Sequence, residues 1–245
     1  MAALRAENGC SWDREQTMES LKPFIIEESY EVLEAIDEKK PEAIKEELGD
    51  LLFQIVFESQ IAKEEGRFDI HDVIAGIGAK MIARHPHVFG DADYKTSEEV
   101  LVHWEAQKKK EGKQRDSLLD GVPKTMPSLL RAHRLQDRAS RVGFDWKRLD
   151  DVLLKLDEEI GEFKEAFEAG RADEIEEELG DVLFMLVNIS RFIGVNPEDA
   201  LRKTISKFIS RFRHIEMTAA DRGVKLSDMT LAEMDALWDE AKKKK

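Results

Sequence analysis

The sequence predicts an all-α protein built from two tandem copies of one helical domain. Three observations predict it. Gly and Pro are scarce, with 14 and 6 in 245 residues, about 8% where about 12% is usual, which leaves few tight turns for an all-β design. Apolar residues recur at helical spacing over long stretches. Finally, three blocks of sequence occur twice in the same order, which indicates a duplicated domain of roughly 115 residues rather than a short solenoid repeat.

The repeat is clearest in its acidic residues. Residues 27–31 and 47–50 recur as residues 158–162 and 178–181, each displaced by 131 positions. Further along, Lys80–Arg84 recurs as Lys207–Arg211 at an offset of 127, and the segment around Trp104 recurs around Trp238 at an offset of 134. The change in offset falls in connecting loops, where insertions are tolerated.

In the first copy, we predict helices over about 14–38, 42–64, 72–85 and 97–110. The first shows apolar positions that share one side at 100° per residue, namely Leu21, Phe24, Ile25, Val32, Ala35 and Ile36. Pro41 suits the first position of the second helix, because proline is tolerated there. The caps predicted for the third and fourth helices are Asp69 or Asp72, and Thr96 or Ser97.

The two copies are predicted to be joined near residues 108–127. A charged run at 108–113 gives way to Gly121-Val122-Pro123 and Pro127, which is typical of a linker and turn. We therefore expect domains at 1–112 and 128–245, with a linker at 113–127. A joining helix over 128–141, capped by Ser128, leads into predicted helices over 148–168, 172–193, 198–221 and 230–243.

Composition excludes several classes of protein. The formal charge of −14 argues against a nucleic-acid partner, which favours a basic face. The single Cys10 cannot form an internal disulfide, and the start MAALRAENG lacks the apolar core of a signal peptide. No apolar run approaches the roughly 20 residues that span a bilayer. We therefore expect a cytoplasmic protein with no membrane segment.

One acidic residue lies where a solvated side chain is not expected. On a helical wheel, Glu28 lies within about 40° of Leu21, Val32 and Ala35, inside the apolar stripe. The second helix is apolar on nearly every side except a strip of Glu47, Asp50 and Gln54. A carboxylate in such surroundings is costly unless it is paired or binds a metal, and gathered like charges repel. A cation is therefore expected.

The acidic set favours a hard divalent cation. Glu-x-x-Glu facing Glu-x-x-Asp on an adjacent antiparallel helix supplies only oxygen ligands, which suit Mg²⁺ or Mn²⁺ better than zinc. Buried ion pairing is the alternative. A ferritin-like di-iron site is excluded because no histidine follows a Glu by three residues. An HD-type phosphohydrolase is excluded because His71-Asp72 lacks an upstream histidine.

Mg²⁺ held by a few carboxylates usually completes its shell with water and substrate phosphates, so phosphate chemistry is the leading class. No G-x-x-x-x-G-K-[ST] phosphate loop occurs. Side-chain cations are therefore expected to hold the phosphates, with a solvated or ion-paired face as the alternative. The candidates are Lys80 and Arg84 in the first copy, and Lys155, Lys207, Arg211 and Arg213 in the second.

Several motifs resemble one known family. They are the EExxE and ExxD helix pair, Trp12-Asp13-Arg14-Glu15-Gln16-Thr17, His85-Pro86-His87-Val88-Phe89, Gly143-Phe144-Asp145-Trp146 and the segment Lys207-Phe208 to Arg213. Together they resemble the MazG family of nucleoside triphosphate pyrophosphohydrolases over nearly the whole chain. Ser11 departs from the family, where Pro commonly precedes the Trp-Asp pair, and affects only a turn.

The resemblance implies an all-α fold of tandem four-helix domains that form a homodimer, a dimerising helical bundle. It also implies Mg²⁺-dependent hydrolysis of an NTP or dNTP to the monophosphate and pyrophosphate, with broad base specificity the safer expectation. Carried over by motif, the Mg²⁺ ligands would be Glu159, Glu162, Glu178 and Asp181 in the second copy and Glu28, Glu31, Glu47 and Asp50 in the first.

The remaining roles are hypotheses. A carboxylate beside the ligands would take a proton from water, and the candidates are Glu158 and, in the first copy, Glu27. Lys207 and Arg211 would stabilise the departing pyrophosphate, and Trp238 would stack on the base unless it is a core residue. We expect the second copy to be the main catalytic unit, because its cation cluster is richer and because Gln54 and Glu58 extend the acidic strip only in the first.

Two other classes remain open from the sequence. The first is a non-catalytic nucleotide sensor or regulatory helical dimer, whose signature would be loss of the acids, and both copies retain all five. The second is a regulated enzyme with one catalytic and one effector-binding copy.

Overall fold

The structure is a computed structural model, and it describes all residues except 97–98, 101–102, 105–106, 108–116 and 244–245. Every regular element in this described part of the chain is helical, which confirms the predicted all-α class. The chain divides into two compact units, Met1–Gln114 and Arg115–Lys245. None of the described helices is both long and apolar enough to cross a bilayer.

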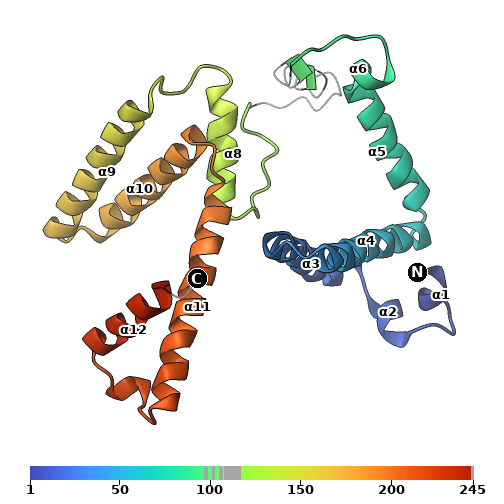
Figure 1. Cartoon of the computed structure of the whole chain (residues 1–245). Helices are drawn as coiled ribbons and strands as arrows, with labels where there is room; N and C mark the ends of the chain where they lie inside the picture. Colours follow the sequence, from blue (N-terminus) through green and yellow to red (C-terminus); the bar gives the residue numbers. More distant parts are fainter. Residues whose placement is uncertain (97–98, 101–102, 105–106, 108–116, 244–245) are drawn as a thin grey trace. The chain divides into compact units, whose positions relative to one another are not determined.

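The N-terminal unit is organised around a hairpin of two long antiparallel helices (Figure 1). Its helices are α1 Ala2–Arg5, α2 Ser11–Glu15, α3 Met18–Glu38, α4 Pro41–Glu64, α5 Ile70–Arg84 and α6 Pro86–Phe89. α3 and α4 form the hairpin, and α5 leads away from the end of α4. The helix predicted over 97–110 lies largely outside the described residues.

The predicted start of the first long helix was wrong. Residues 14 to 38 do not form one helix, because Gln16 is extended, with φ −69° and ψ 143°. Thr17 then caps α3: its hydroxyl accepts a hydrogen bond from the Ser20 amide, and the Ser20 hydroxyl accepts one from the Thr17 amide. This reciprocal capping box fixes the beginning of a helix, so α2 is separate.

The core of the N-terminal hairpin is small. Leu21 of α3 packs with Phe57 and Ile61 of α4, and all three are at most 4% exposed. Met1, Met18 and Phe24 pack against them. Burial of such large side chains contributes roughly 1.5–3 kcal/mol each, and these contacts hold the two helices at a fixed register.

The C-terminal unit repeats the hairpin and adds a helix before it. Its helices are α8 Ser128–Ser140, α9 Leu149–Ala169, α10 Ala172–Phe192, α11 Pro197–Asp221 and α12 Leu231–Lys243, with a short 3₁₀ turn, η1 Leu226–Asp228. α9 and α10 form the hairpin, α8 packs against α10 and α11, and α12 packs against α11 (Figure 1). The predicted helix ends in this unit agree with the structure to within one residue.

The same turn closes both hairpins. Lys39 after α3 and Gly170 after α9, 131 positions later, both adopt the left-handed conformation, with φ of 56° and 67°. Glycine adopts this conformation at little cost, whereas a residue with a Cβ is strained. Pro41 occupies the first turn of α4, as predicted. The duplication is therefore visible in backbone geometry as well as in sequence.

Each hairpin leaves a row of large apolar side chains in solvent. Leu48, Leu52 and Ile55 of α4 are 51, 56 and 42% exposed. The equivalent residues of α10, again 131 positions later, are Leu179, Leu183 and Leu186, at 48, 46 and 47%. Their spacing of four and three residues places each row on one helix face.

Candidate metal centres

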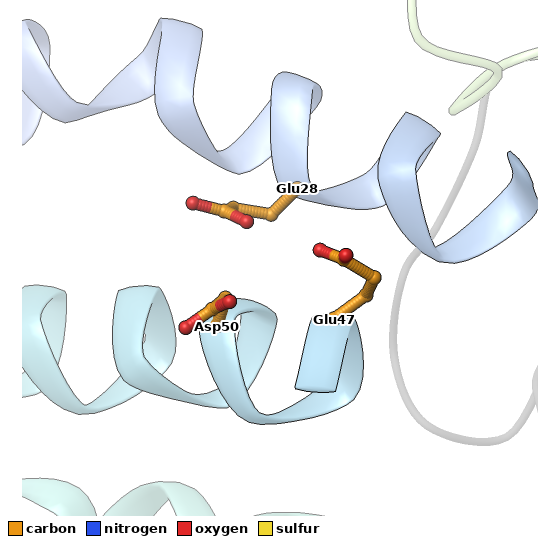
Figure 2. Close-up of side chains that lie close together, drawn as sticks. All are labelled: Glu28, Glu47 and Asp50. Atoms are coloured by element: carbon orange, nitrogen blue, oxygen red, sulfur yellow. The ribbon is translucent and has the colours of Figure 1, made fainter. Parts of the chain in front are cut away.

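Three carboxylates meet between α3 and α4. Glu28 of α3 points toward Glu47 and Asp50 of α4 (Figure 2). Each supplies one oxygen, and these three oxygens all lie within 4.8 Å of one another. Because Glu47 and Asp50 are three residues apart, they share one face of α4. We call this set the N-terminal cluster.

Crowding raises the pKa of two members of the N-terminal cluster. The pKa of Glu28 is raised by partial burial and by repulsion from Glu31 and Asp50, against a lowering hydrogen bond from Gln54. The pKa of Glu47 is raised by burial first and then by Glu31 and Asp50. In both groups, burial and neighbouring negative charges disfavour the ionised form, which indicates an excess of negative charge at this site.

The C-terminal hairpin repeats the arrangement. Glu159 of α9 meets Glu178 and Asp181 of α10, again with one oxygen from each within 4.8 Å of the others. Glu159 is only 7% exposed. The pKa of Glu178 is raised by burial and then by repulsion from Glu162 and Asp181. We call this set the C-terminal cluster.

Each predicted set of four metal ligands has three carboxylates that converge and a fourth that lies beside them. Glu31 and Glu162 lie outside the groups of three but close enough to raise the pKa values of Glu47 and Glu178. Both are exposed, one turn beyond Glu28 and Glu159. They therefore remain candidates for the outer side of each site.

The two residues predicted to accept a proton from water, Glu158 and Glu27, lie in different surroundings. Glu158 and Glu27 are both exposed beside the clusters. Glu158 accepts a hydrogen bond from Lys155 Nζ at 2.6 Å, and the same ammonium lies 2.8 Å from Glu159 Oε1. Lys155, predicted as a substrate-binding residue, therefore contacts the C-terminal cluster directly.

The other predicted cations lie on later helices. Lys207, Arg211 and Arg213 are on α11, and Lys80 and Arg84 are on α5. Among the described residues, no hydrogen bond or ion pair joins the three α11 cations to the carboxylates of α9 and α10. In the described part of the chain, Lys207, Arg211 and Arg213 therefore form no polar contact with the C-terminal cluster.

Both copies stack an arginine on a tryptophan. The Arg84 guanidinium lies 5.1 Å from the Trp104 ring centroid, and that of Arg211 lies 5.4 Å from Trp238. Trp238 also contacts Phe208, with ring centroids 5.2 Å apart. Cation–π contacts of this kind contribute about 0.5–1 kcal/mol at exposed sites. Trp238 is half-buried, so at least part of its role is to pack α12 against α11.

The sequence did not reveal how the segment before α9 is held. Asp145 accepts hydrogen bonds from both terminal nitrogens of Arg191, at 2.9 and 2.5 Å. The motif Gly143-Phe144-Asp145-Trp146 has no predicted role beyond the family resemblance, and the signal that could have suggested one is the aromatic-Asp pair Trp12-Asp13 in the first copy. The pair fixes the entry to α9 against the end of α10.

The donor set fits a hard divalent cation. In each cluster, three converging carboxylates supply the charge and the oxygen ligands that Mg²⁺ or Mn²⁺ requires, and crowding raises the pKa values of Glu28, Glu47 and Glu178 among them. Mg²⁺ usually keeps several waters and substrate oxygens when only a few carboxylates hold it. The described part of the chain holds these two groups and no other of three or more potential ligands.

Fold and site together define an all-α protein in which a helical hairpin carrying a carboxylate cluster occurs twice. The MazG nucleotide pyrophosphohydrolase domain matches residues 16–89 and 148–216, the segments that contain the two hairpins. The chain belongs to this family. The predictions of a MazG-type hydrolase and of two MazG segments are thereby confirmed.

Individual relatives extend the match to nearly the whole chain. The chain is 48% identical over 245 residues to the nucleoside triphosphate pyrophosphohydrolase/pyrophosphatase MazG of Thermotoga maritima, covering 99% of this chain and 92% of the relative. It is 45% identical over 243 residues to the nucleoside triphosphate pyrophosphohydrolase of Escherichia coli K12, with 97% and 92% covered. It is also 50% identical to Bacillus subtilis YabN, covering 98% of this chain and 49% of that protein.

Proposed function

We propose that this protein hydrolyses nucleoside triphosphates to the monophosphate and pyrophosphate, with the C-terminal cluster as the main catalytic centre. The observation that carries the proposal is the convergence of Glu159, Glu178 and Asp181 on a hairpin that matches the MazG domain. The relatives named as nucleoside triphosphate pyrophosphohydrolases support the same substrate class. Broad base specificity is part of the proposal, because metal and phosphate contacts carry no base information.

Mg²⁺ is the proposed cofactor, with Mn²⁺ as a substitute. Glu159, Glu178 and Asp181 would hold it, with Glu162 at the outer edge, and Glu28, Glu31, Glu47 and Asp50 would do so in the N-terminal hairpin. When bound, such an ion neutralises phosphate charge and lowers the pKa of a bound water. The protein supplies a hairpin whose packing fixes the three carboxylates before the substrate arrives.

The remaining side chains have proposed roles in moving a proton and holding charge. Glu158, exposed and beside Glu159, would accept the proton of the attacking water, and Glu27 is its counterpart. Lys155, Lys207, Arg211 and Arg213 would bind the phosphates, with Trp238 against the base. Lys80 and Arg84 are the corresponding cations of the first copy.

A homodimer is also proposed. Rows of leucine and isoleucine at 42 to 56% exposure on α4 and α10 form apolar faces that a single hairpin cannot bury. Two hairpins that pack these faces together would form a four-helix bundle, and burying apolar area is the main force for such association. The division into domains 1–112 and 128–245 around a linker at 113–127 remains a proposal as well.

Product identification tests the proposed reaction. Purified protein is incubated with NTPs or dNTPs and Mg²⁺, and the products are followed by ³¹P NMR. We expect equal amounts of monophosphate and pyrophosphate, and no reaction in excess EDTA. Diphosphate with phosphate would indicate another phosphohydrolase, and absence of turnover would favour the alternative of a nucleotide-sensing or regulatory helical dimer.

A further inference from the structure

The two clusters differ in what already balances their charge. In the C-terminal cluster, the ammonium of Lys155 lies 2.8 Å from Glu159 Oε1 and 2.6 Å from Glu158 Oε1. The Glu159 side chain is 9% exposed and that of Lys155 is 34% exposed. A cation of the protein itself therefore occupies one oxygen of the buried member of the cluster.

The N-terminal cluster has no such cation at the corresponding position. Counting back 131 residues from Lys155 gives Phe24, which packs against the hairpin core. Glu28 instead faces the Gln54 amide, whose Nε2 lies 3.4 Å from Glu28 Oε1. Gln54 is 6% exposed, and its counterpart in the second copy is Met185. Where the second copy has a lysine and a methionine, the first copy therefore has a phenylalanine and a glutamine.

This difference in side chains changes the electrostatic cost of binding a divalent cation at each cluster. An ammonium repels a cation at short range, and the repulsion is stronger at a partly buried site than in bulk water. Before a divalent cation can use the Glu159 oxygen, Lys155 must leave it. A neutral amide in the N-terminal cluster imposes no comparable repulsion.

The ammonium of Lys155 can move to other oxygen partners once it leaves Glu159. Its side chain is a point charge on a flexible four-carbon stem, it is one third exposed, and it begins one turn before Glu159. The phosphates of a nucleotide bound over the cluster would offer it new oxygen partners. Binding of one ligand would then favour the other, and the effect must be reciprocal.

We propose that Lys155 is a resident counter-ion of the C-terminal cluster. A divalent cation displaces it, the nucleotide triphosphate accepts it, and cation and nucleotide therefore bind cooperatively at this site. The N-terminal cluster, which lacks the lysine, binds a divalent cation independently of nucleotide. The inference rests on the proposed function, because it takes the C-terminal cluster as the site where cation and nucleotide meet.

Mn²⁺ titration of the full-length chain tests the proposal, with free Mn²⁺ measured by electron paramagnetic resonance. Asp50→Asn disables the N-terminal cluster, so that the C-terminal cluster is observed alone. In that background, Lys155→Met should bind Mn²⁺ about tenfold more tightly without nucleotide, the size expected for removing one charge at a partly buried site. A non-hydrolysable α,β-imido triphosphate should tighten Mn²⁺ binding in the Asp50→Asn protein and much less in the double variant.

Lys164→Met is the matched control. Lys164 is an exposed lysine of α9, nine residues further along and therefore on the opposite side of the helix. It should leave Mn²⁺ affinity unchanged. Lys155→Gln repeats the main test with a polar side chain, and circular dichroism checks that each variant is folded.

The comparison of the two clusters completes the test. Asp181→Asn leaves only the N-terminal cluster, and Mn²⁺ bound there should not respond to the nucleotide analogue. Mn²⁺ affinity that is equal in Lys155→Met and Lys164→Met would overturn the proposal, as would equal nucleotide responses of the two clusters. Triphosphate hydrolysis by the unmodified protein is measured separately, so a failed counter-ion role and a failed pyrophosphohydrolase assignment give different results.

Discussion

Arg191 near the end of α10 binds both carboxylate oxygens of Asp145, which lies in the segment before α9. The two side chains are 14% and 23% exposed, and Arg191 also donates to Asn188 Oδ1 at 3.0 Å. The N-terminal hairpin uses another arginine for the same purpose. Arg5 binds Glu64 at the end of α4 and the backbone carbonyl of Gln16, just before α3. Each copy therefore ties the entry of its first long helix to the end of its second.

Asp145→Asn should destabilise the C-terminal unit by about 1–2 kcal/mol, because a bidentate and largely buried charge pair is lost. Urea unfolding followed by circular dichroism measures the change. Asp150→Asn is the matched control, since its pair with Arg148 is about two thirds exposed and such surface pairs contribute little. Equal destabilisation by the two variants would contradict the role of the Arg191 pair.

Glu159→Gln should lower kcat by at least about 100-fold, because it removes a buried member of the proposed catalytic cluster. Glu28→Gln, the same change 131 residues earlier, should lower kcat by less than about threefold if the clusters act independently. Steady-state release of pyrophosphate measures both. Equal losses would show that the two clusters share catalysis, against our assignment of the C-terminal cluster as the main centre.

The raised pKa of Glu178 makes stability depend on pH. Because the folded protein binds this proton more readily than the unfolded chain, Glu178 favours folding most at pH values below its ordinary pKa of 4.5, and the contribution is lost as pH rises through the raised pKa. Without metal, Glu178→Gln should therefore be more stable than the unmodified protein near pH 7. The difference should shrink as pH falls toward about 4.5.

Thermal unfolding in EDTA across this pH range measures that difference. Addition of Mg²⁺ near neutral pH should raise the melting temperature of the unmodified protein more than that of Glu178→Gln, since a ligand stabilises the state that binds it. A difference in melting temperature that does not vary with pH would contradict the electrostatic explanation.

Leu183→Glu should weaken or abolish the proposed homodimer, because it places a charge in the exposed apolar row of α10. Light scattering coupled to size-exclusion chromatography measures the mass. Leu231→Glu is the control: Leu231 is 73% exposed at the start of α12 and outside that row. A monomeric unmodified protein, or an unchanged mass for Leu183→Glu, would refute the proposed interface.

Much of the fold could be predicted from local signals. In the C-terminal unit, helix ends are marked by residues with strong positional preferences, such as Gly170 after α9 and Pro197 at the start of α11. The helical wheel also identified Glu28 as an acid on the packed side of α3. These features depend on periodicity and on neighbours within one turn, which a sequence displays directly.

Other features depend on distances that the sequence does not display. The break at Gln16 follows from a hydrogen-bonded cap between Thr17 and Ser20, not from proline or glycine. The contact of Arg191 with Asp145 joins residues 46 positions apart. Whether three or four acids converge depends on side-chain rotamers, and Glu31 and Glu162 lie just outside the groups of three.

Hydrolysis in H₂¹⁸O tests the central claim most directly, because it identifies the phosphorus atom that water attacks. We predict that one ¹⁸O appears in the nucleoside monophosphate and none in the pyrophosphate, that the reaction requires Mg²⁺, and that Glu159→Gln abolishes it. Label in pyrophosphate or in inorganic phosphate would contradict the account, and so would turnover that survives Glu159→Gln.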